Sequence, residues 1–289
     1  MTGLSASKQL WWVLGFVLLL SLGVNMVIFG IYDWDLDDPF SRGLASALGL
    51  PAAIVNGRFV PLRNFYERSD MVMDLRQVGG SNSGISSQDL LTDLVREELV
   101  RELAARNQIT VSSTQLALYA EYLTRSIAGG GDLQKFGLSA DQFMNDFALP
   151  DYLKSLVAIR YLLEHGGKTA EEAQEARVQI VSGTMTFADA ATKYSDDEAS
   201  KYLGGDIGFW EQTDLPPWEG TAVFGLDLGE VSEVVVSPDG YRIFTVTARD
   251  EDSNPPQLQV RQIFFADHSF DEFFEDYSSR QSVYFFRNL

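Results

Sequence analysis

Three stretches late in the chain carry its strongest fold signals: VSGTMTFADAATKYSDDEASKYLGGDIGFW (181–210), TAVFGLDLGEVSEVVVSPDGYRIFTVTARD (221–250) and LQVRQIFFAD (258–267). Thr186 followed by Asp189 is typical of a helix N-cap, so a helix is expected to begin there. Pro238-Asp239-Gly240 separates two runs rich in valine, isoleucine and aromatic residues, which predicts two strands joined by a tight turn. The stretches together predict an α+β fold.

The order of motifs in these stretches resembles that of a parvulin, the PpiC-type peptidyl-prolyl isomerase domain. The motifs are Tyr-Ser-Asp-Asp (194–197), Gly-Gly-Asp-Ile-Gly (204–208), Ala-Val-Phe-Gly-Leu (222–226) and Leu-Gly-Glu-Val-Ser (228–232). Upstream, AAIVNGRFV (52–60) and the helical text of residues 90–116 resemble the N-terminal chaperone module of SurA-like proteins. The chain is therefore identified as similar to SurA and PrsA chaperones with a parvulin domain.

One feature of the sequence departs from the order that this resemblance implies. A parvulin opens with a central strand of the form R-x-H-I-L-V, but this chain has YLLEHGGKTAEEA (161–173) in that place. Leu258–Phe265 instead follows the last expected strand, so we infer a circular permutation in which it supplies the central strand of an antiparallel sheet. The alternative is an added strand beside an incomplete sheet.

The end of the chain is expected to return to the first module. Asn56-Gly57 predicts a type I′ hairpin between two short strands, because both turn residues need positive φ. An isolated hairpin is only marginally stable, so a third strand is expected. Ser269–Tyr277 is predicted as a helix, and Ser282–Phe286 as the strand that pairs with the Ala52–Val60 hairpin.

The expected organisation has five parts. Helices are predicted from Ser86 to about Arg106, over 113–126, 140–147 and 151–164, and from a capping box at Thr169 and Glu172. A glycine run (129–131) should end the helix that covers 113–126. GGSNSG (79–84) is predicted as a loop. The parts are a cytoplasmic stub with a transmembrane anchor (1–33), a linker (34–50), a helical chaperone module with the hairpin (51–165), a parvulin-like domain (166–268) and a C-terminal helix and strand (269–289).

An uncharged run from Leu10 to Tyr32 predicts the membrane anchor, because about 20 apolar helical residues cross a hydrocarbon core. Trp11 and Trp12 at one end, with Tyr32 and Trp34 at the other, suit the interfacial aromatic belt. Lys8 precedes the run and Asp33 follows it, so the N-terminus is expected in the cytoplasm and the body outside the cell membrane. The alternative is a cleaved signal peptide, although this run is longer than the apolar segment of a typical signal peptide.

Composition excludes several kinds of chemistry. The formal net charge is -19, which disfavours nucleic acid binding because the phosphate backbone is also negative. The chain has no cysteine, so it contains neither disulfides nor thiolate sites, and its two histidines are too few for a multi-histidine metal site. No cofactor or metal is expected.

The parvulin resemblance implies a pocket with an acidic residue, an apolar seat for proline and two histidines on the sheet. The acid falls on Asp197, and the two histidine positions are occupied by Gln262 and Arg242. An Arg242–Asp197 ion pair is one possible arrangement. In the family an aromatic residue lies five residues before the phenylalanine that matches Phe224. Here Trp218 lies six residues before Phe224, so an alignment without a gap puts Glu219 at the position of that aromatic residue. The residues expected to bind substrate are Phe209, Trp210, Leu215, Trp218 and Phe224.

These features predict a membrane-anchored extracytoplasmic folding factor that binds unfolded or proline-containing segments of exported proteins, with a degenerate isomerase domain. Prolyl isomerisation needs no nucleophile, because the barrier arises from amide resonance. An active isomerase and a non-catalytic docking protein at the membrane surface are the alternatives. His165 is expected at a helix C-terminus and His268 in a solvated loop, although His268 lies close enough in sequence to reach the pocket.

Overall fold

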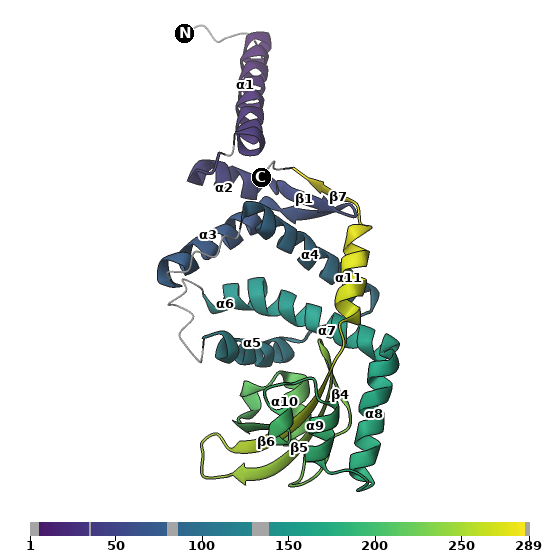
Figure 1. Cartoon of the computed structure of the whole chain (residues 1–289). Helices are drawn as coiled ribbons and strands as arrows, with labels where there is room; N and C mark the ends of the chain where they lie inside the picture. Colours follow the sequence, from purple (N-terminus) through teal and green to yellow (C-terminus); the bar gives the residue numbers. More distant parts are fainter. Residues whose placement is uncertain (1–5, 35, 80–85, 129–138, 287–289) are drawn as a thin grey trace. The chain divides into compact units, whose positions relative to one another are not determined.

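The computed structural model of the chain describes residues 6–34, 36–79, 86–128 and 139–286 (Figure 1). The chain forms two compact units, residues 1–98 with 281–289 and residues 99–280. Each unit has its own antiparallel sheet, three-stranded in the first and four-stranded in the second. The α+β fold predicted from the sequence is confirmed.

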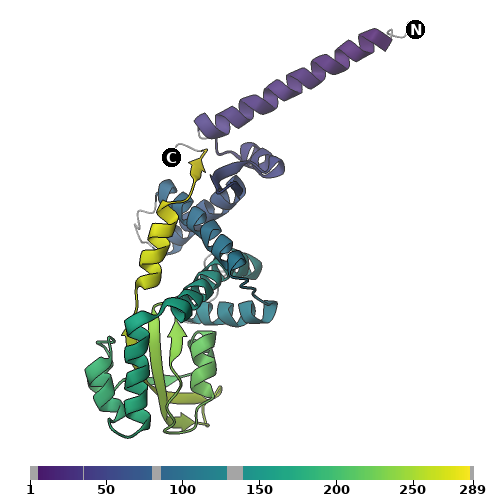
Figure 2. The same ribbon diagram turned by 90° about the vertical axis from the view of Figure 1, so that its right-hand side faces the viewer.

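The first unit begins with α1 (Ala6–Asp33), one uninterrupted helix (Figure 2). Its residues Phe16–Asp33 are long and apolar enough to cross a membrane, and a signal sequence near an N-terminus meets the same criterion. Asn25 is its one strongly polar side chain in this stretch before Asp33, and its amide donates a hydrogen bond to the Ser21 carbonyl (2.8 Å), which keeps it satisfied within the helix.

The segment for which the sequence predicts a linker contains a second helix, α2 (Pro39–Leu48). Asp38 caps it by accepting hydrogen bonds from the backbone N–H groups of Phe40 (3.0 Å) and Ser41 (3.3 Å), and Pro39 suits the first turn. Gly49 ends it with a left-handed φ of 63°. The linker prediction is therefore wrong for residues 39–48. Asp-Pro is a helix start signal, but the prediction relied on the aspartate, glycine and serine content of the whole segment.

The first sheet is built from the hairpin and from the end of the chain. β1 (Pro51–Val55) and β2 (Arg58–Pro61) are joined by Asn56 and Gly57, both at positive φ as a type I′ turn requires. β7 (Val283–Phe285) pairs with β1, with Ile54 opposite Tyr284, and the order is β2-β1-β7. This is the pairing that the sequence predicts.

Two long helices complete the first unit. α3 (Leu62–Gly79) follows the hairpin directly and was not predicted. α4 (Ser87–Arg106) was predicted, and its capping box is present: Asp89 N–H donates to Ser86 Oγ (3.1 Å), and Ser86 N–H donates to Asp89 (2.8 Å). The boundary between the two units falls within α4, between Glu98 and Leu99.

The second unit starts with helices. α5 (Ser113–Ala128) is followed by α6 (Ala140–Phe143), a π-helical turn (Met144–Ala148) and α7 (Leu149–His165). The last three are continuous, whereas the sequence predicts separate helices over 140–147 and 151–164. Pro150 explains the wide turn, because it has no N–H to donate and its ring displaces the carbonyl one turn earlier.

Two helices and several short turns then lead to the second sheet. α8 (Gly167–Val181) begins at Gly167, so Thr169 lies inside it and the predicted Thr169–Glu172 cap is wrong. α9 (Phe187–Tyr194) starts as predicted, with Thr186 Oγ1 accepting from Asp189 N–H (3.1 Å). Two 3-10 turns (Lys201–Leu203 and Gln212–Asp214) flank β3, and α10 (Pro217–Phe224) precedes β4.

The second sheet has the strand order β3-β6-β5-β4. Its strands are β3 (Asp206–Trp210), β4 (Val235–Ser237), β5 (Gly240–Asp250) and β6 (Gln257–Ala266). β6 is the last of these four strands along the chain, yet it lies between β3 and β5 and pairs antiparallel with both. The prediction that a strand near the C-terminus occupies the middle of this sheet is confirmed.

The second sheet is covered on both faces by helices (Figures 1 and 2). Ile243 and Ile263 are buried with residues of α8 and α9 on one face. Phe244 and Val260 are buried on the other face with Leu215, which precedes α10, and with Val223 of α10. Each strand alternates between the faces, so both cores use the same strands. α11 (Ser269–Ser279) follows β6.

Two further predictions compare with the described residues as follows. The expected parvulin boundary at residue 166 lies within the second compact unit, which also contains α5 to α7. The glycine run (129–131), most of the predicted GGSNSG loop and the side chains of Trp11 and Trp12 lie outside the described residues and side chains.

Candidate functional site

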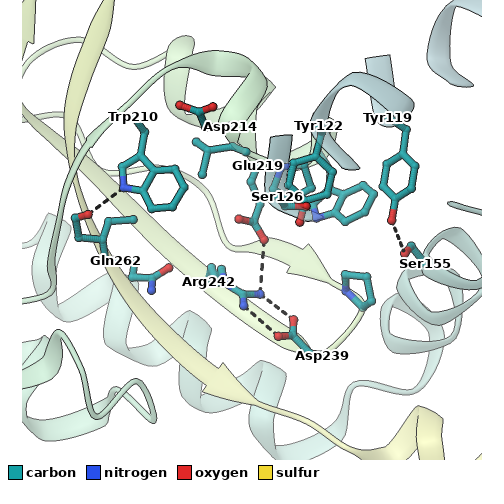
Figure 3. Close-up of a pocket in the computed structure, with 15 residues that line it drawn as sticks. Tyr119, Tyr122, Ser126, Ser155, Trp210, Asp214, Glu219, Asp239, Arg242 and Gln262 are labelled. Atoms are coloured by element: carbon teal, nitrogen blue, oxygen red, sulfur yellow. Dashed lines mark hydrogen bonds and ion pairs between the residues drawn. The ribbon is translucent and has the colours of Figure 1, made fainter. Parts of the chain in front are cut away.

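A pocket of about 490 Å³ lies on the α10 face of the second sheet (Figure 3). Its residues come from three separate parts of the chain: α5 with α7, the segment from β3 to β5, and β6. They are Tyr119, Tyr122, Ser126, Ser155, Ile207, Trp210, Asp214, Leu215, Pro216, Trp218, Glu219, Pro238, Asp239, Arg242 and Gln262.

The two family histidine positions lie together on the floor of this pocket. In the sheet register Arg242 is opposite Phe264 and Gln262 is opposite Phe244. Residues that pair across strands share a face, and so do residues two positions apart, so Arg242 and Gln262 are diagonal neighbours on one face. The central strand β6 therefore places Gln262 beside Arg242 on this face.

Asp197 contacts the pocket through Gln262. The Gln262 amide donates a hydrogen bond to Asp197 Oδ2 (2.9 Å), Ser200 Oγ donates to the same oxygen, and Ala199 N–H donates to Oδ1 (3.1 Å). Burial acts to raise the pKa of Asp197, but these hydrogen bonds together outweigh it and hold the pKa below its ordinary value. At neutral pH the side chain is a carboxylate that accepts hydrogen bonds.

Backbone pairing with β6 positions Asp197. In the Tyr-Ser-Asp-Asp motif, Asp196 N–H donates to the Phe264 carbonyl (2.7 Å), and the buried Ser195 Oγ accepts from Phe264 N–H (3.1 Å). Gly205 then approaches β6 so closely that a Cβ there would lie 2.3 Å from the Gln262 carbonyl oxygen. Its φ of 80° also favours glycine. The motif and the glycine thus fix the acid beside the strand.

Arg242 is held by acidic residues other than Asp197. Its two terminal nitrogens donate to Asp239 Oδ1 (2.7 Å) and Oδ2 (2.9 Å), and Nη1 lies 3.4 Å from Glu219 Oε1. The guanidinium also lies over the Phe264 ring, 4.2 Å from its centroid. The Arg242–Asp197 ion pair weighed from the sequence is not formed. The tight turn of the β4–β5 hairpin puts Asp239 three residues from Arg242, and this local partner prevails.

Glu219 is a buried carboxyl group at the back of the pocket. It accepts a hydrogen bond from the fully buried Ser237 hydroxyl (2.6 Å) and faces Arg242. Burial raises the pKa of Glu219 above its ordinary value, although the charge of Arg242 and the bond from Ser237 oppose this. The residue at the ungapped position of the family aromatic is therefore part of a charged network, with two carboxyl groups sharing one arginine.

Stacked aromatic rings form one wall of the pocket. Tyr119 of α5 stacks on Tyr152 of α7 (centroids 4.5 Å apart), and both rings are nearly parallel to that of Trp218 in α10 (5.9 and 6.3 Å). The sequence predicts a helix over 113–126 but singles out neither Tyr119 nor Tyr122 as a site residue. About 90 residues separate α5 from α10, so no local pattern could reveal that they share a site.

An ion-pair cluster attaches α5 to the rim of the pocket. Arg125 Nη1 lies 2.6 Å from Glu211 Oε2 and 3.1 Å from Asp214 Oδ1. Glu211 and Asp214 bracket the 3-10 turn between β3 and α10. Because these groups are partly exposed, each pair stabilises the contact only modestly. The ion-pair cluster instead orients α5 over the pocket.

The residues expected to bind substrate divide into two groups. Trp210, Leu215 and Trp218 line the pocket. Phe209 does not: its side chain is half exposed, because strand alternation turns it away from its neighbour Trp210. Phe224 does not line the pocket either; it packs against the apolar core beneath α10.

The two histidines lie outside the pocket. His165 is at the end of α7, where its ring stacks on Tyr161 (4.5 Å) and Nδ1 lies 3.0 Å from the Tyr161 carbonyl oxygen. His268 is exposed at the start of α11. Among the residues that the structure describes, no three histidine, aspartate or glutamate side chains form a metal-binding group.

Comparison with known proteins agrees with this geometry. Residues 163–248 match the protein family described as Rotamase: PPIC-type PPIASE domain. The match stops before β6, as expected if the central strand is supplied from a permuted position.

Curated relatives are chaperones and foldases. The chain is 29% identical over 186 residues to chaperone SurA of Methylococcus capsulatus, covering 63% of this chain and 37% of SurA. It is 29% identical over 121 residues to foldase protein PrsA 2 of Bacillus anthracis (40% and 41%). It is 22% identical over 224 residues to foldase protein PrsA of Halalkalibacterium halodurans (63% and 66%). The chain thus spans less than two thirds of the length of each of these relatives.

Proposed function

The chain is a SurA- and PrsA-like protein with a parvulin domain, and from this premise we propose that it is a folding factor that captures extended segments of unfolded, exported polypeptides in the aromatic pocket. The observation that carries the proposal is the pocket itself. Its volume of about 490 Å³ lies within the range of ligand pockets, roughly 300–1,000 Å³. Four aromatic rings and two prolines line it beside a few polar groups.

These surroundings suit a proline-containing segment of an unfolded chain. Apolar and aromatic side chains such as Leu215 and Trp210 give an extended peptide a surface on which proline and large side chains lose contact with water. Ser126 and Ser155 add hydroxyl groups for backbone recognition. Because aromatic contacts tolerate many partners, the site fits a broad range of clients.

Peptide affinity tests this assignment directly. We expect Tyr122→Ala to weaken binding of a fluorescent peptide containing Phe-Pro about fivefold, the effect of losing roughly 1 kcal/mol of contact. Tyr202→Ala is the matched control, since Tyr202 is exposed and does not line the pocket. The measurement is fluorescence anisotropy with the full chain in detergent micelles. Equal affinity for both variants and the unchanged protein would remove the pocket from the proposal.

We propose further that the isomerase activity of the domain is degenerate. An isomerase lowers the barrier by binding the twisted amide more tightly than the planar one. Arg242 is a permanent cation held by Asp239 and Glu219, so it cannot replace a neutral imidazole that donates and accepts. Gln262 retains a hydrogen-bonding amide but cannot change protonation state.

Refolding of a protein limited by prolyl isomerisation distinguishes these roles. We expect the full chain to leave the slow rate unchanged while it suppresses aggregation of the same client at stoichiometric ratio. Acceleration of the slow phase by the chain, lost in Asp197→Asn and retained in the neighbouring Glu198→Gln, would establish the active isomerase instead.

The active isomerase is the second candidate because one polar element of the site is retained. Asp197 remains ionised, next to the pocket and hydrogen-bonded to the residue on the central strand. In that case the Asp197–Gln262 pair would orient the substrate amide.

The anchor and the orientation form part of the same proposal. We infer that α1 crosses the cell membrane, with Lys8 on the cytoplasmic side and the body outside. Protease added to intact cells should then remove the body, and a reporter fused to the N-terminus should stay protected. A body recovered free of the membrane fraction would instead identify α1 as a cleaved signal sequence.

A further inference from the structure

The small sheet of the first unit exposes an apolar face. Phe59, Ile54 and Tyr284 lie side by side across β2, β1 and β7, because the register pairs Ile54 with both of the others. Phe59 is 62% exposed and Tyr284 66% exposed. Residues of the opposite face behave differently, since Ala53 and Val55 of the same strand are completely buried. The middle of that face is therefore packed, although Phe285 at its β7 edge is 46% exposed, and the other face presents the large exposed side chains of Phe59 and Tyr284.

The exposed face is the one beside the end of α1. Phe286 continues the β1–β7 ladder, its N–H donating to the Ala52 carbonyl (3.1 Å), so its side chain lies on the face of Tyr284, two residues earlier. The Phe286 ring contacts the ring of Tyr32 at the end of α1 (centroids 5.9 Å apart). Tyr32 Oη also donates to the Pro51 carbonyl (2.8 Å), which ties the last turn of α1 to the first residue of β1.

The segment that follows α1 adds further exposed apolar side chains. Trp34 is 61% exposed and packs edge-on against Phe29 of α1. Phe40, at the first turn of α2, is 70% exposed. The neighbouring Arg42 does not add a free charge here, because it pairs with Asp37 (2.5 Å) and Asp70 (2.6 Å).

We propose that this face, Ile54, Phe59, Tyr284 and Phe286 together with Trp34 and Phe40, docks on the interfacial region of the phospholipid bilayer that α1 enters. The proposal rests on the anchoring of the chain by α1. The bilayer is the occupant because the face adjoins the last turn of the apolar helix, where the membrane surface must lie if α1 spans it. Tyrosine, tryptophan and phenylalanine are the side chains that enter this region most favourably.

The chemistry of the face also indicates which lipids it needs. None of the six side chains is charged, and Asp33, Asp37 and Asp38 lie close by in sequence. Attraction to anionic headgroups therefore cannot drive the docking. The face should dock on neutral phosphatidylcholine as well as on anionic bilayers, and salt should not release it.

Site-specific labelling tests the docking in the full chain. The chain has no cysteine, so a single introduced cysteine carries an environment-sensitive fluorophore without background. Phe59→Cys reports the proposed face. Arg58→Cys is the matched control, because Arg58 is the adjacent residue on β2 and pairs with Val55, which lies on the other face of the sheet. Leu20→Cys reports whether α1 is in the bilayer. Each variant is reconstituted in phosphatidylcholine nanodiscs with and without nitroxide-labelled lipid.

The expected result is strong quenching at Leu20 and at Phe59, with at least threefold less quenching at Arg58. Quenching at Leu20 alone would overturn the docking and leave the anchor intact, with the aromatic face then open to a polypeptide or a second copy. Absence of quenching at both Leu20 and Phe59 would overturn the membrane anchor and the docking together. Equal quenching at Phe59 and Arg58 would show unspecific insertion and also overturn the docking.

A second pair of labels guards against misfolding. Tyr284→Cys and Val283→Cys lie on β7, on the exposed and the opposite face respectively, and they should repeat the difference between Phe59 and Arg58. If labels on both strands fail to distinguish the two faces while circular dichroism matches that of the unmodified chain, the proposal is wrong.

Discussion

The two faces of the four-stranded sheet are built from the same strands, yet they differ in kind. Toward α8 and α9, Ile243, Ile263 and Phe265 form a core of buried apolar side chains. Toward α10, Phe244 and Val260 are equally buried, but Arg242 and Gln262 interrupt the apolar surface and open into the pocket. Residues adjacent in sequence therefore belong to different environments.

The difference separates stability from binding within a single strand. Ile263 and Gln262 are neighbours on β6, but the first fills a core and the second contacts a carboxylate at the pocket. A step of one residue changes the role of a side chain, because successive residues of a strand point to opposite faces. Substitutions on the two faces should then separate loss of folding from loss of binding.

The largest expected effect is on the α8–α9 face. Ile263→Ala should lower the free energy of unfolding by about 3 kcal/mol, because it removes three buried carbons and leaves a cavity among close-packed residues. Urea denaturation followed by circular dichroism measures this. Gln262→Ala is the control from the adjacent position, and a smaller loss for Ile263→Ala than for Gln262→Ala would contradict the division between the faces.

The next effect concerns the charged network of the pocket face. Arg242→Met should cost about 2 kcal/mol at pH 7, because it leaves the carboxyl groups of Asp239 and Glu219 close together without their cation. Burial acts to raise the pKa of Asp239, and Arg242 outweighs it and holds that pKa below its ordinary value.

The same network predicts a pH dependence. A carboxyl group with a lowered pKa contributes stability above its unfolded pKa, and this contribution is lost as the pH falls through the folded pKa. The curves for the unchanged protein and Arg242→Met should therefore converge below about pH 4, where unfolded aspartate is protonated. Arg249→Met is the control on the same strand: Arg249 donates to the Leu226 carbonyl (3.2 Å) and has an exposed carboxylate partner at 3.7 Å, so its deficit should not change with pH in the same way.

A smaller effect is expected at the hydrogen bond between the strand and the acid. Gln262→Ala should lower stability by about 1 kcal/mol and raise the pKa of Asp197 toward its ordinary value, because one of the hydrogen bonds that lower it is lost. Carboxyl carbon NMR titration of Asp197 measures the shift. Gln259→Ala removes the comparable bond to Asp206 (2.9 Å) on the same strand and should leave the Asp197 titration unchanged.

The smallest effect is expected outside the pocket, at a residue that the sequence assigned to it. Phe209→Ala should change stability by no more than about 0.5 kcal/mol and leave peptide affinity unaltered, since the ring is half exposed. Trp210→Ala, one residue further, should weaken peptide binding in the same anisotropy measurement. Reversed results would place the binding surface on the outer side of β3.

Much of the architecture could be predicted from local patterns. Asn56-Gly57 predicted the hairpin, and Ser86 with Asp89 predicted the start of α4. The sequence of Leu258–Phe265 predicted the central strand that a parvulin usually has at its start. Each of these signals depends on a few residues in contact along the chain. The Asp38-Pro39 start of α2 was equally local, and it was overlooked within a segment rich in aspartate, glycine and serine.

The site was predictable only in part. The family resemblance led to Asp197, Gln262 and Arg242, and the sheet register places the last two on one face. It could not supply the partner of Arg242, because Asp239 and Asp197 are both acidic residues within reach of a plausible pocket. Nor could it identify Tyr122, whose role depends on where α5 packs.

The sequence by itself determined the secondary structure of the central strands, the turn between them and the absence of thiol chemistry, because these depend on residue type and on neighbours along the chain. Only the tertiary structure decided which acid holds Arg242, which aromatic rings face the pocket, and that the exposed rings of Phe59 and Tyr284 lie beside the end of α1. Apart from the Asp239–Arg242 pair, which lies within one hairpin, these contacts join segments tens to hundreds of residues apart. Their geometry follows from packing and strand register, which no short stretch of sequence contains.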